Sequence, residues 1–436
     1  MIATWLTLAF LGGICFLLFP EPWFIQNIEV FSWLIVSITS IVFVVHVFRK
    51  HRETTLMTII FLGYFLRIGL LVWDAYFHHV VPLFHSGADT EMFYRIGLEF
   101  LADSSAMSGF GNYPGFLYRI FFLFGPQRIV AQYVNVLFAV SAVLIAYKIL
   151  QKFQISDRTS TLMLATAMFA PHFMMINVIL LREAPIAFMV VVSLYLFVIW
   201  FKKGNVIALG AAFLSAAGAA LFHSGSIAIV AGYALCVVFY DRKKQAFRLK
   251  WTSVIYALML TVLFFTVNYF WGEAIFGHWQ FESVDDLAGH LARQPLGGAA
   301  YAVHIPTGNS YLDIIVNTPI RTLYFLLSPM PWDWRSPWDV AAFILSSAFF
   351  GYFYCTAFKT LRTTKGDSEN KNVIIMLLLM SVSSAIIFGW GVSNSGTALR
   401  HRDKFFLQHV LMFVFCLEER ARAHIPRSLR PAIGGR

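Results

Sequence analysis

Charged residues are scarce in this sequence, at 13% of 436 residues, whereas soluble domains carry roughly 25%. Cysteines are few too, and the four present have no paired spacing and lie inside apolar runs, so they predict buried free thiols. They are Cys15, Cys236, Cys355 and Cys416. The chain also lacks internal repeats, low-complexity tracts and a separable soluble domain. These absences indicate that water is not the main solvent of this protein.

Hydrophobic residues make up 58% of the chain and are gathered in long runs. At about 1.5 Å per residue such runs cross a lipid core of about 30 Å as helices, whereas a barrel strand needs only about 10 alternating residues. We therefore predict an all-α polytopic membrane protein of about twelve transmembrane helices. The predicted spans lie near residues 2–19, 30–48, 56–77, 129–150, 159–179, 184–201, 205–222, 225–240, 252–271, 338–358, 373–391 and 404–417.

The segments between the predicted spans suggest how the chain is organised. Two apolar stretches, Phe116 to Phe124 and Ile320 to Leu327, are too short to span and predict interfacial or re-entrant helices. They accompany two long outer loops, 78–115 and 272–319. We expect an N-terminal transmembrane hairpin over residues 1–55 and a single transmembrane domain over 56–436.

Basic residues are distributed unevenly over the two sides of the predicted bundle. Two thirds of the 33 lysines and arginines fall in short connections on one side, which the positive-inside rule assigns to the cytoplasm. Both termini are then cytoplasmic, in a plasma (inner) membrane, and the long loops are extracytoplasmic. The net charge of +10 follows from this topology and needs no nucleic-acid partner.

The first outer loop carries two acidic residues, Asp89 and Glu91, followed by a turn-like segment around Tyr113. Helical periodicity from Asp89 to Leu101 predicts that Asp89 caps a helix on the outer leaflet. Alternatively, Asp89 is a general base, because a carboxylate at this boundary can accept the proton of a sugar hydroxyl.

Arg182 and Glu183 stand at the outer start of the sixth span, with Pro185 in its first turn. Free amides, the helix dipole and a guanidinium directed at one volume form an anion site that suits phosphate. The alternative is an arginine that reaches the membrane surface and pairs with a lipid phosphate or with Glu183.

Further polar residues lie at two short outer connections and inside one span. His223 joins two spans and is either an interface residue or part of a site, with Ser224 or Ser226 as the expected helix cap. In the last outer turn three cations and a histidine, Arg400, His401, Arg402 and Lys404, either hold an anion or pair with the acidic outer loops.

Arg67 lies near the middle of the third span, where a charge is expensive and usually faces protein or water. It lines a cavity or forms a structural ion pair with Asp74. The acidic residues of the second outer loop show no metal-ligand spacing.

Taken in order, these segments resemble the glycosyltransferase C superfamily of membrane enzymes that use polyprenyl-linked sugars. The resemblance includes protein mannosyltransferase-like enzymes, with polysaccharide polymerases as architectural relatives. It rests on the acidic loop Asp89-Thr90-Glu91, the turn Asn112-Tyr113-Pro114 and the acidic Glu183 at the outer end of an apolar hairpin. The end of the chain, from Ser328-Pro329-Met330-Pro331-Trp332 to Gly396-Thr397-Ala398-Leu399-Arg400-His401-Arg402, looks like exopolysaccharide-cluster proteins. Relative to that superfamily, the transmembrane hairpin of residues 1–55 is an additional N-terminal segment.

The resemblance implies a donor of polyprenyl phosphate or pyrophosphate type and a glycan, lipid or protein acceptor, handled on the extracytoplasmic side for cell-envelope polysaccharide synthesis. Asp89 would be the base, with Glu91 as the second candidate, and no cofactor is certain, a divalent metal being left open. The substrate-binding residues would be Arg67, Tyr113, Arg182, Glu183, His223, Arg400, His401 and Arg402.

Two other functions stay open at this point. A transporter or flippase of lipid-linked oligosaccharide is expected to contain inverted repeats and helices broken near mid-membrane, and the sequence indicates neither clearly. A non-catalytic partner in a polysaccharide assembly complex would keep the fold without its chemistry.

Overall fold

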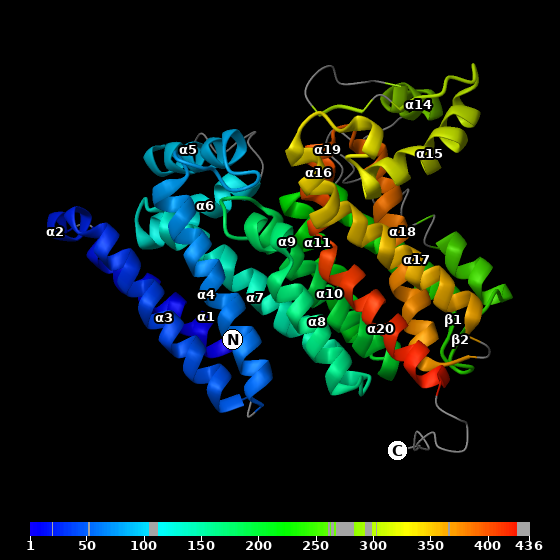
Figure 1. The fold of residues 1–436 in the computed structure, drawn as a ribbon, viewed down its shortest axis with the longest axis horizontal. Coiled ribbons are helices and arrows are strands. Elements are labelled where there is room, and N and C mark those ends of the chain that lie inside the picture. Colours follow the sequence, from blue (N-terminus) through cyan, green and yellow to red (C-terminus); the bar gives the residue numbers. More distant parts are fainter. Residues whose placement is uncertain are drawn as a thin grey trace. The chain divides into compact units, whose positions relative to one another are not determined.

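A computed structural model describes the chain except for residues 20, 51–52, 104–111, 260–261, 263–265, 267–282, 293–298, 302, 365–366 and 425–436. The described residues are almost entirely helical (Figure 1). The one sheet among them is a short antiparallel hairpin of β1 (Tyr240–Asp241) and β2 (Ala246–Phe247). The prediction of an all-α protein is confirmed.

Several helices have the length and composition of membrane spans. Six such helices lie within the part of the chain that the structure describes. They are α3 (Ile28–Lys50), α4 (Thr54–Phe77), α7 (Arg128–Lys152), α10 (Glu183–Lys203), the segment Pro337–Thr363 and α18 (Glu369–Gly391). Shorter apolar helices are α1 (Ile2–Leu18), α11 (Val206–Phe222) and Ser224–Phe239. The chain is a multi-pass membrane protein. Half of the predicted span over 252–271 lies outside the described residues.

The chain forms two compact units. The first comprises Met1–Leu144 and Leu164–Phe188. It holds α1, α3, α4, α2 (Pro22–Gln26), α5 (Ala88–Ala102), α6 (Asn112–Phe124), α9 (Pro171–Ile176), most of α7 and the end of α8 (Asp157–Phe169). Within it α3 runs beside α1, and α5 packs on α6 (Figure 1). The predicted boundary after residue 55 lies inside this unit.

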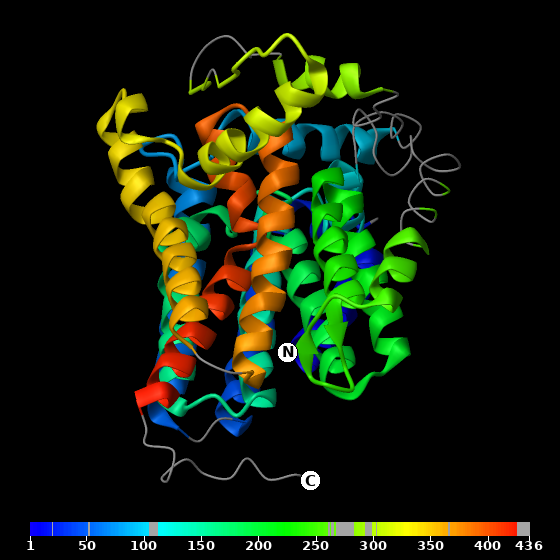
Figure 2. The same cartoon turned by 90° about the vertical axis from the view of Figure 1, so that its right-hand side faces the viewer.

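The second unit comprises Ile145–Met163 and Met189–Arg436. Its remaining helices are η2 (Ser224–Ile227), α12 (Ala228–Phe239), α14 (Val284–Ala292), α15 (Ser310–Leu327), η4 (Pro331–Asp333), α16 (Pro337–Ala342), η5 (Phe343–Ser347), α17 (Ala348–Thr363), α19 (Ser395–Asp403) and α20 (Phe406–His424). At the centre α18 packs against α12, α15 and α20 (Figure 2).

Glycine allows the close approach of α12 to α18. A Cβ on Gly232 of α12 would lie 2.4 Å from Cα of Met380 in α18, which leaves no space for a side chain. The neighbouring α11 buries the small residues Ala212, Ala216 and Ala219, as close helix packing requires, but its Gly210 is exposed. A Cβ on Gly210 would meet nothing within 4 Å.

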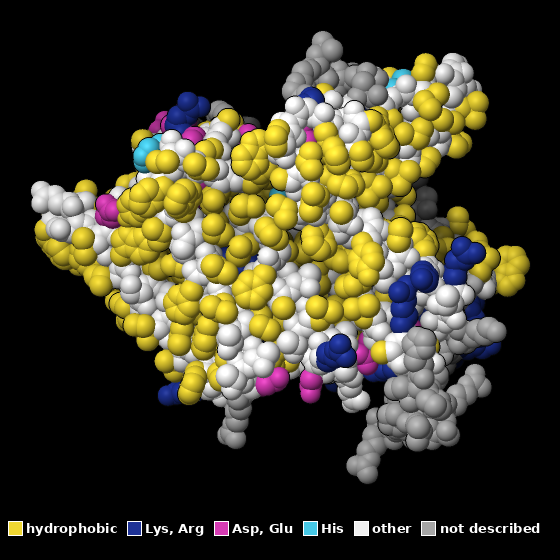
Figure 3. All heavy atoms as spheres, viewed as in Figure 1, with side chains coloured by type: hydrophobic (Ala, Val, Ile, Leu, Met, Phe, Trp, Pro, Cys, Tyr) yellow, Lys and Arg dark blue, Asp and Glu magenta, His cyan; other side chains and the backbone are white. Residues whose placement is uncertain are grey.

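Apolar side chains cover much of the outside of the helices. In Figure 3 hydrophobic side chains cover the visible side of α17, and lysine and arginine side chains gather towards the lower right of the view. Tyr352 and Phe358 of α17 are exposed, as is Cys355, so the prediction that all four thiols are buried is wrong for this one. Cys355 lies among apolar side chains on a face that suits lipid contact.

The predicted span 159–179 is broken. α8 ends at Phe169, Ala170 has a ψ of 112°, and α9 begins at Pro171. Proline disfavours helical backbone in the residue before it and has no N–H to continue the ladder. The N–H of Ala170 still donates to the Thr166 carbonyl at 2.9 Å, so the carbonyls after Thr166 are left for other donors.

Candidate functional site

Polar residues form a stripe on the first half of α7. Arg128, Gln132 and Asn135 occur at spacings of four and three residues, which places them on one helix face, and the last two are fully buried. Arg128 Nη2 donates to Glu91 Oε1 at 2.6 Å, and Gln132 Nε2 donates to Asp74 Oδ2 at 2.5 Å. Buried polar groups are tolerated when hydrogen-bonded, so this face fixes α4 and α5 relative to α7.

The last residue of the stripe holds the segment that leads into α10. Asn135 Nδ2 donates to the carbonyls of Ile179, at 2.6 Å, and Leu181, at 3.1 Å. It also lies 3.3 Å from the hydroxyl oxygen of Tyr113 in α6. One amide group therefore positions both Tyr113 and the backbone just before Arg182.

Glu183 is the first residue of α10 and only 1% exposed, and Arg182 beside it is partly buried. Tyr113 lies within the electrostatic influence of both side chains. Burial raises the pKa of Tyr113 well above its usual range, so its phenol stays protonated and can donate a hydrogen bond. Carboxylate, guanidinium and phenol thus gather at one helix N-terminus, where Pro185 occupies the first turn as predicted. We call Tyr113, Arg182 and Glu183 the α10 cluster.

The first outer loop forms the predicted helix, but its start differs. α5 is capped by Gly87, whose N–H and carbonyl both bond to the hydroxyl of Thr90. The prediction that Asp89 caps this helix is wrong, because Asp89 lies within the first turn, partly buried. Glu91 is about half exposed and forms a salt bridge with Arg128.

The segment expected to be a turn at Asn112-Tyr113-Pro114-Gly115 is helical instead. α6 begins at Asn112, and Tyr113, Pro114 and Gly115 are buried in its first turn. Proline is well tolerated in the first turn of a helix, where its missing N–H has no partner to lose.

Arg67 of α4 is fully buried and uses its donors on carbonyls. Nη1 donates to Gly63 at 2.9 Å and to Met168 at 2.8 Å, and Nη2 donates to Ala167 at 3.4 Å. The last two carbonyls belong to the end of α8 that the break at Pro171 leaves without amide donors. Among the described contacts Arg67 has no ion pair with Asp74, so the ion-pair alternative is wrong.

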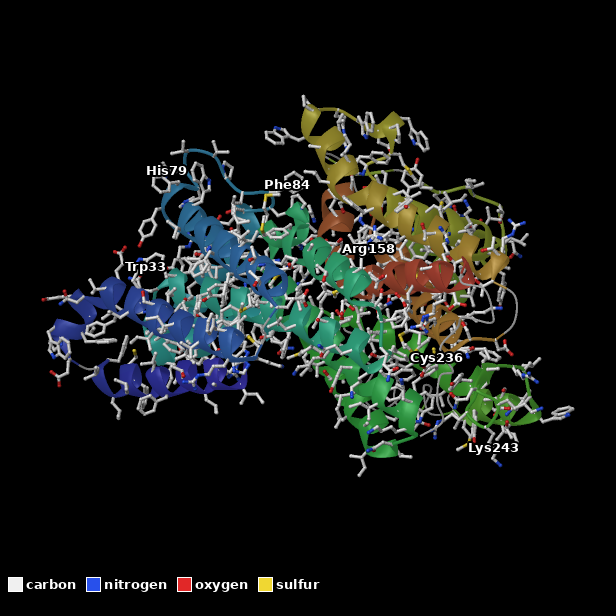
Figure 4. The ribbon with its side chains drawn as sticks, turned by 60° about the horizontal axis from the view of Figure 1, so that its bottom comes forward. Trp33, His79, Phe84, Arg158, Cys236 and Lys243 are labelled. Atoms are coloured by element: carbon white, nitrogen blue, oxygen red, sulfur yellow. The ribbon has the colours of Figure 1, made fainter. Side chains whose placement is uncertain are left out.

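Two histidines also meet in the first unit. Nε2 of His85, in the loop before α5, lies 3.3 Å from Nε2 of His172 in α9. Phe84, labelled in Figure 4, packs edge-on against both rings, with centroids 4.8 and 5.5 Å away. This contact ties the loop before α5 to the broken helix.

A second group of predicted residues meets in the second unit. His223, which ends α11, lies with Nε2 3.1 Å from Nε2 of His401 in α19. Lys404 Nζ lies 2.9 Å from Nδ1 of His401. The expectation that Ser224 or Ser226 caps the following helix is wrong, because a 3₁₀ turn without a side-chain cap begins at Ser224.

The two arginines of α19, Arg400 and Arg402, differ in environment. Arg402 is 1% exposed, and its guanidinium donates to the carbonyls of Leu326 and Ser328 and covers the ring of Phe350. Burial lowers the pKa of Arg402 to about 10. Its contacts cap the end of α15, as cations do at helix C-termini. Arg400 is only partly buried, and its predicted role in phosphate binding stays a prediction.

Sequence reasoning missed Gln132 and Asn135, whereas Lys404 was among the cations that it singled out in the turn before the last span. The signal for the first two was available, because an amide every turn in an otherwise apolar span marks a polar face. In the described ranges no group of three or more His, Cys, Asp or Glu side chains is placed to hold a metal ion.

We expect Gln132→Leu to destabilise the first unit, because it removes the amide donor from the buried carboxyl of Asp74. A hydrogen bond of this kind contributes about 1.5–3 kcal/mol when its acceptor is charged. Thermal unfolding in detergent measures the effect. Gln151→Leu, at an exposed position near the other end of α7, is the matched control and should leave the midpoint unchanged. Equal midpoints for the two variants would contradict the role of this bond.

The arrangement of the first unit offers a buried carboxylate, a guanidinium and a phenol at a helix start, with Asp89 on α5, which packs against α6. This set of groups can bind an anion and accept a proton. No protein-family model, curated protein or solved structure matches this chain.

Proposed function

We propose that this protein is a membrane glycosyltransferase that moves a sugar or oligosaccharide from a polyprenyl phosphate or pyrophosphate donor to a glycan, lipid or protein acceptor. The observation that carries the proposal is the α10 cluster. Glu183 is 1% exposed at the start of a helix long enough to span a membrane, with Arg182 beside it. Ionisable groups in such places are costly and usually serve a substrate or an ion.

In the proposed topology about twelve spans cross the plasma (inner) membrane, and both termini lie in the cytoplasm. It is supported by the concentration of basic residues in the connections on one side, which include the β1–β2 hairpin. Lys243, at the tip of that hairpin, is exposed and points away from the bundle in Figure 4. In this topology α5 and the start of α10 belong to the extracytoplasmic side.

The proposed chemistry places the anionic head of the donor at Arg182 and the free amides of α10. Tyr113 donates a hydrogen bond to the same anionic head, and Glu183 accepts hydrogen bonds from sugar hydroxyls. The anomeric carbon exchanges its bond to the phosphate oxygen for one to the acceptor oxygen, and Asp89 takes the acceptor's hydroxyl proton. Arg402 is left out of this site because its donors hold the end of α15.

A second candidate function has a specific observation in its favour. A flippase or transporter of lipid-linked oligosaccharide would use broken helices, and the α8–α9 break beside the buried Arg67 is one. The glycosyltransferase is preferred because Arg67 is occupied by backbone carbonyls, whereas the α10 cluster combines the groups that donor binding needs.

Reconstitution separates the two functions. The purified protein is placed in proteoliposomes with a polyprenyl phosphate that carries a radiolabelled sugar, and a soluble glycan acceptor is added outside. A glycosyltransferase moves the label to the acceptor and leaves unlabelled polyprenyl phosphate. A flippase changes only the leaflet in which the labelled lipid is found, which a membrane-impermeant reagent detects. Label that moves between leaflets but never to the acceptor would reject the enzyme.

A further inference from the structure

The β1–β2 hairpin joins two apolar helices of the second unit, α12 and the helix over residues 251–259. In a multi-pass membrane protein a short connection of this kind lies where its helices leave the lipid, at the level of the phospholipid headgroups. Five of the nine residues from 242 to 250 are basic and none is acidic. The basic residues are Arg242, Lys243, Lys244, Arg248 and Lys250.

Contacts with two helices hold the β1–β2 hairpin in place. Tyr240 of β1 stacks on Phe201 of α10 with ring centroids 4.2 Å apart. Asn372 of α18 donates to a carbonyl of the turn at 2.5 Å. The guanidinium of Arg242 packs against the end of α10, where a Cβ on Gly204 would lie 1.6 Å from Nη1. The hairpin therefore presents its turn from a fixed place on the unit.

Nearby acidic residues neutralise only part of this charge. Asp241 of β1 forms a salt bridge with Lys250, and its Oδ1 accepts the backbone N–H groups of Lys243 and Lys244 at 3.0 and 3.3 Å. The two lysines are exposed, and within the described part of the chain their ammonium groups form no ion pair. Arg248 is exposed as well and lies 3.9 Å from an exposed aspartate, a pairing that contributes little. These three cations are left for an anion outside the protein.

Large apolar side chains lie beside these charges. Leu249 is 78% exposed, and Trp251, which follows Lys250 directly, is 86% exposed. The helix that begins there continues to expose apolar side chains, among them Ile255 and Leu258. Tryptophan prefers the level between headgroups and acyl chains, and lysine can reach from that level to the headgroups. A soluble anion would leave Leu249 and Trp251 in water, whereas a phospholipid covers them.

We infer that the β1–β2 hairpin binds the headgroup of an anionic phospholipid. Lys243, Lys244 and Arg248 hold the headgroup phosphate, and Trp251 packs beside the upper part of the acyl chains. We call these four residues the hairpin patch. A basic residue near an anionic membrane surface strengthens binding about fivefold, so the three cations together give a marked preference for anionic over neutral phospholipid. The inference needs neither the proposed function nor the side of the membrane on which the hairpin lies.

The test follows the fluorescence of Trp251 in the full-length protein, placed in nanodiscs of phosphatidylcholine. Subtracting the emission of Trp251→Phe from that of the wild type isolates this residue among the twelve tryptophans. Part of the phosphatidylcholine is then replaced by phosphatidylglycerol with brominated acyl chains, which quench tryptophan on contact. We expect brominated phosphatidylglycerol to quench Trp251 at a much lower mole fraction than brominated phosphatidylcholine does.

Charge variants, each measured with and without Trp251→Phe, test the role of the lysines. Lys243→Gln with Lys244→Gln removes two charges and should lower the preference for phosphatidylglycerol about 25-fold, at about fivefold for each charge. Lys243→Arg with Lys244→Arg keeps the charge and should keep the preference. Lys359→Gln with Arg362→Gln removes two exposed charges from α17 and is the matched control, so its preference should equal that of the wild type.

Three results would overturn the inference. The first is equal quenching of Trp251 by the two brominated lipids in the wild type. The second is a loss of preference in the α17 control as large as in the lysine pair, because general surface charge would then explain it. The third is release of the quenching by millimolar glycerol 3-phosphate, because the hairpin patch would then bind a free phosphate. Sugar transfer enters none of these readouts, so the lipid site and the proposed function fail separately.

Discussion

Gly232→Ala is expected to lower the stability of the second unit by about 1–3 kcal/mol, which is typical of overpacking. The new Cβ would lie 2.4 Å from Cα of Met380 and 2.9 Å from its Cγ. A flexible side chain can move away, but a backbone Cα cannot, so α12 and α18 must separate. The loss exceeds the gain of up to about 1 kcal/mol that alanine brings to a helix. Thermal unfolding in detergent, followed by size-exclusion profiles, measures it.

Gly210→Ala is the matched control for this prediction. The same substitution is made in the neighbouring apolar helix, where a Cβ would meet nothing within 4 Å. Its unfolding midpoint should equal or slightly exceed that of the wild type. A Gly232→Ala protein as stable as Gly210→Ala would show that α12 and α18 do not approach each other this closely.

Asp89→Asn is expected to reduce sugar transfer by about 10²- to 10⁴-fold, the usual contribution of a positioned general base. Asparagine keeps the size and the hydrogen-bonding reach of the side chain but cannot take the acceptor's proton. The rate constant of transfer is measured in proteoliposomes with saturating donor. The unfolding midpoint is measured beside it and should be unchanged, because Gly87 and not Asp89 caps α5.

Two neighbouring carboxylates sharpen this prediction. Glu99→Gln, on the same helix in an exposed pair with Arg95, is the control and should keep the wild-type rate. Glu91→Gln should have a smaller effect than Asp89→Asn, because Glu91 is held by Arg128. A large loss with Glu91→Gln and none with Asp89→Asn would exchange the two assignments.

Hydropathy predicted the helical segments well where one apolar run makes one helix. The predicted spans 2–19, 30–48 and 56–77 correspond to α1, α3 and α4, with ends that differ by a few residues. Lipid exposure imposes a long, local apolar signal that needs no knowledge of neighbours. The α8–α9 break was missed because hydropathy averaged over a span does not register one proline, whereas the backbone does.

The candidate site was less predictable. The sequence pointed to Arg182 and Glu183 because they interrupt an apolar hairpin. Nothing in it indicated that Arg402 would donate to the carbonyls at the end of α15, because these contacts join residues 74 and 76 positions apart. Nor could it show that Lys404 would reach His401, since charge alone predicts a solvated side chain.

The Arg67 contacts also predict that two positions of the sequence vary together. The guanidinium supplies donors to two carbonyls that an unbroken helix would satisfy by itself, so Arg67 is needed because Pro171 is present. The two positions are then epistatic: alanine at 171 should make loss of the arginine tolerable, whereas either replacement alone leaves donors or acceptors unmatched in the bundle. Among related chains, a proline here and an arginine on the facing helix should be retained together or disappear together.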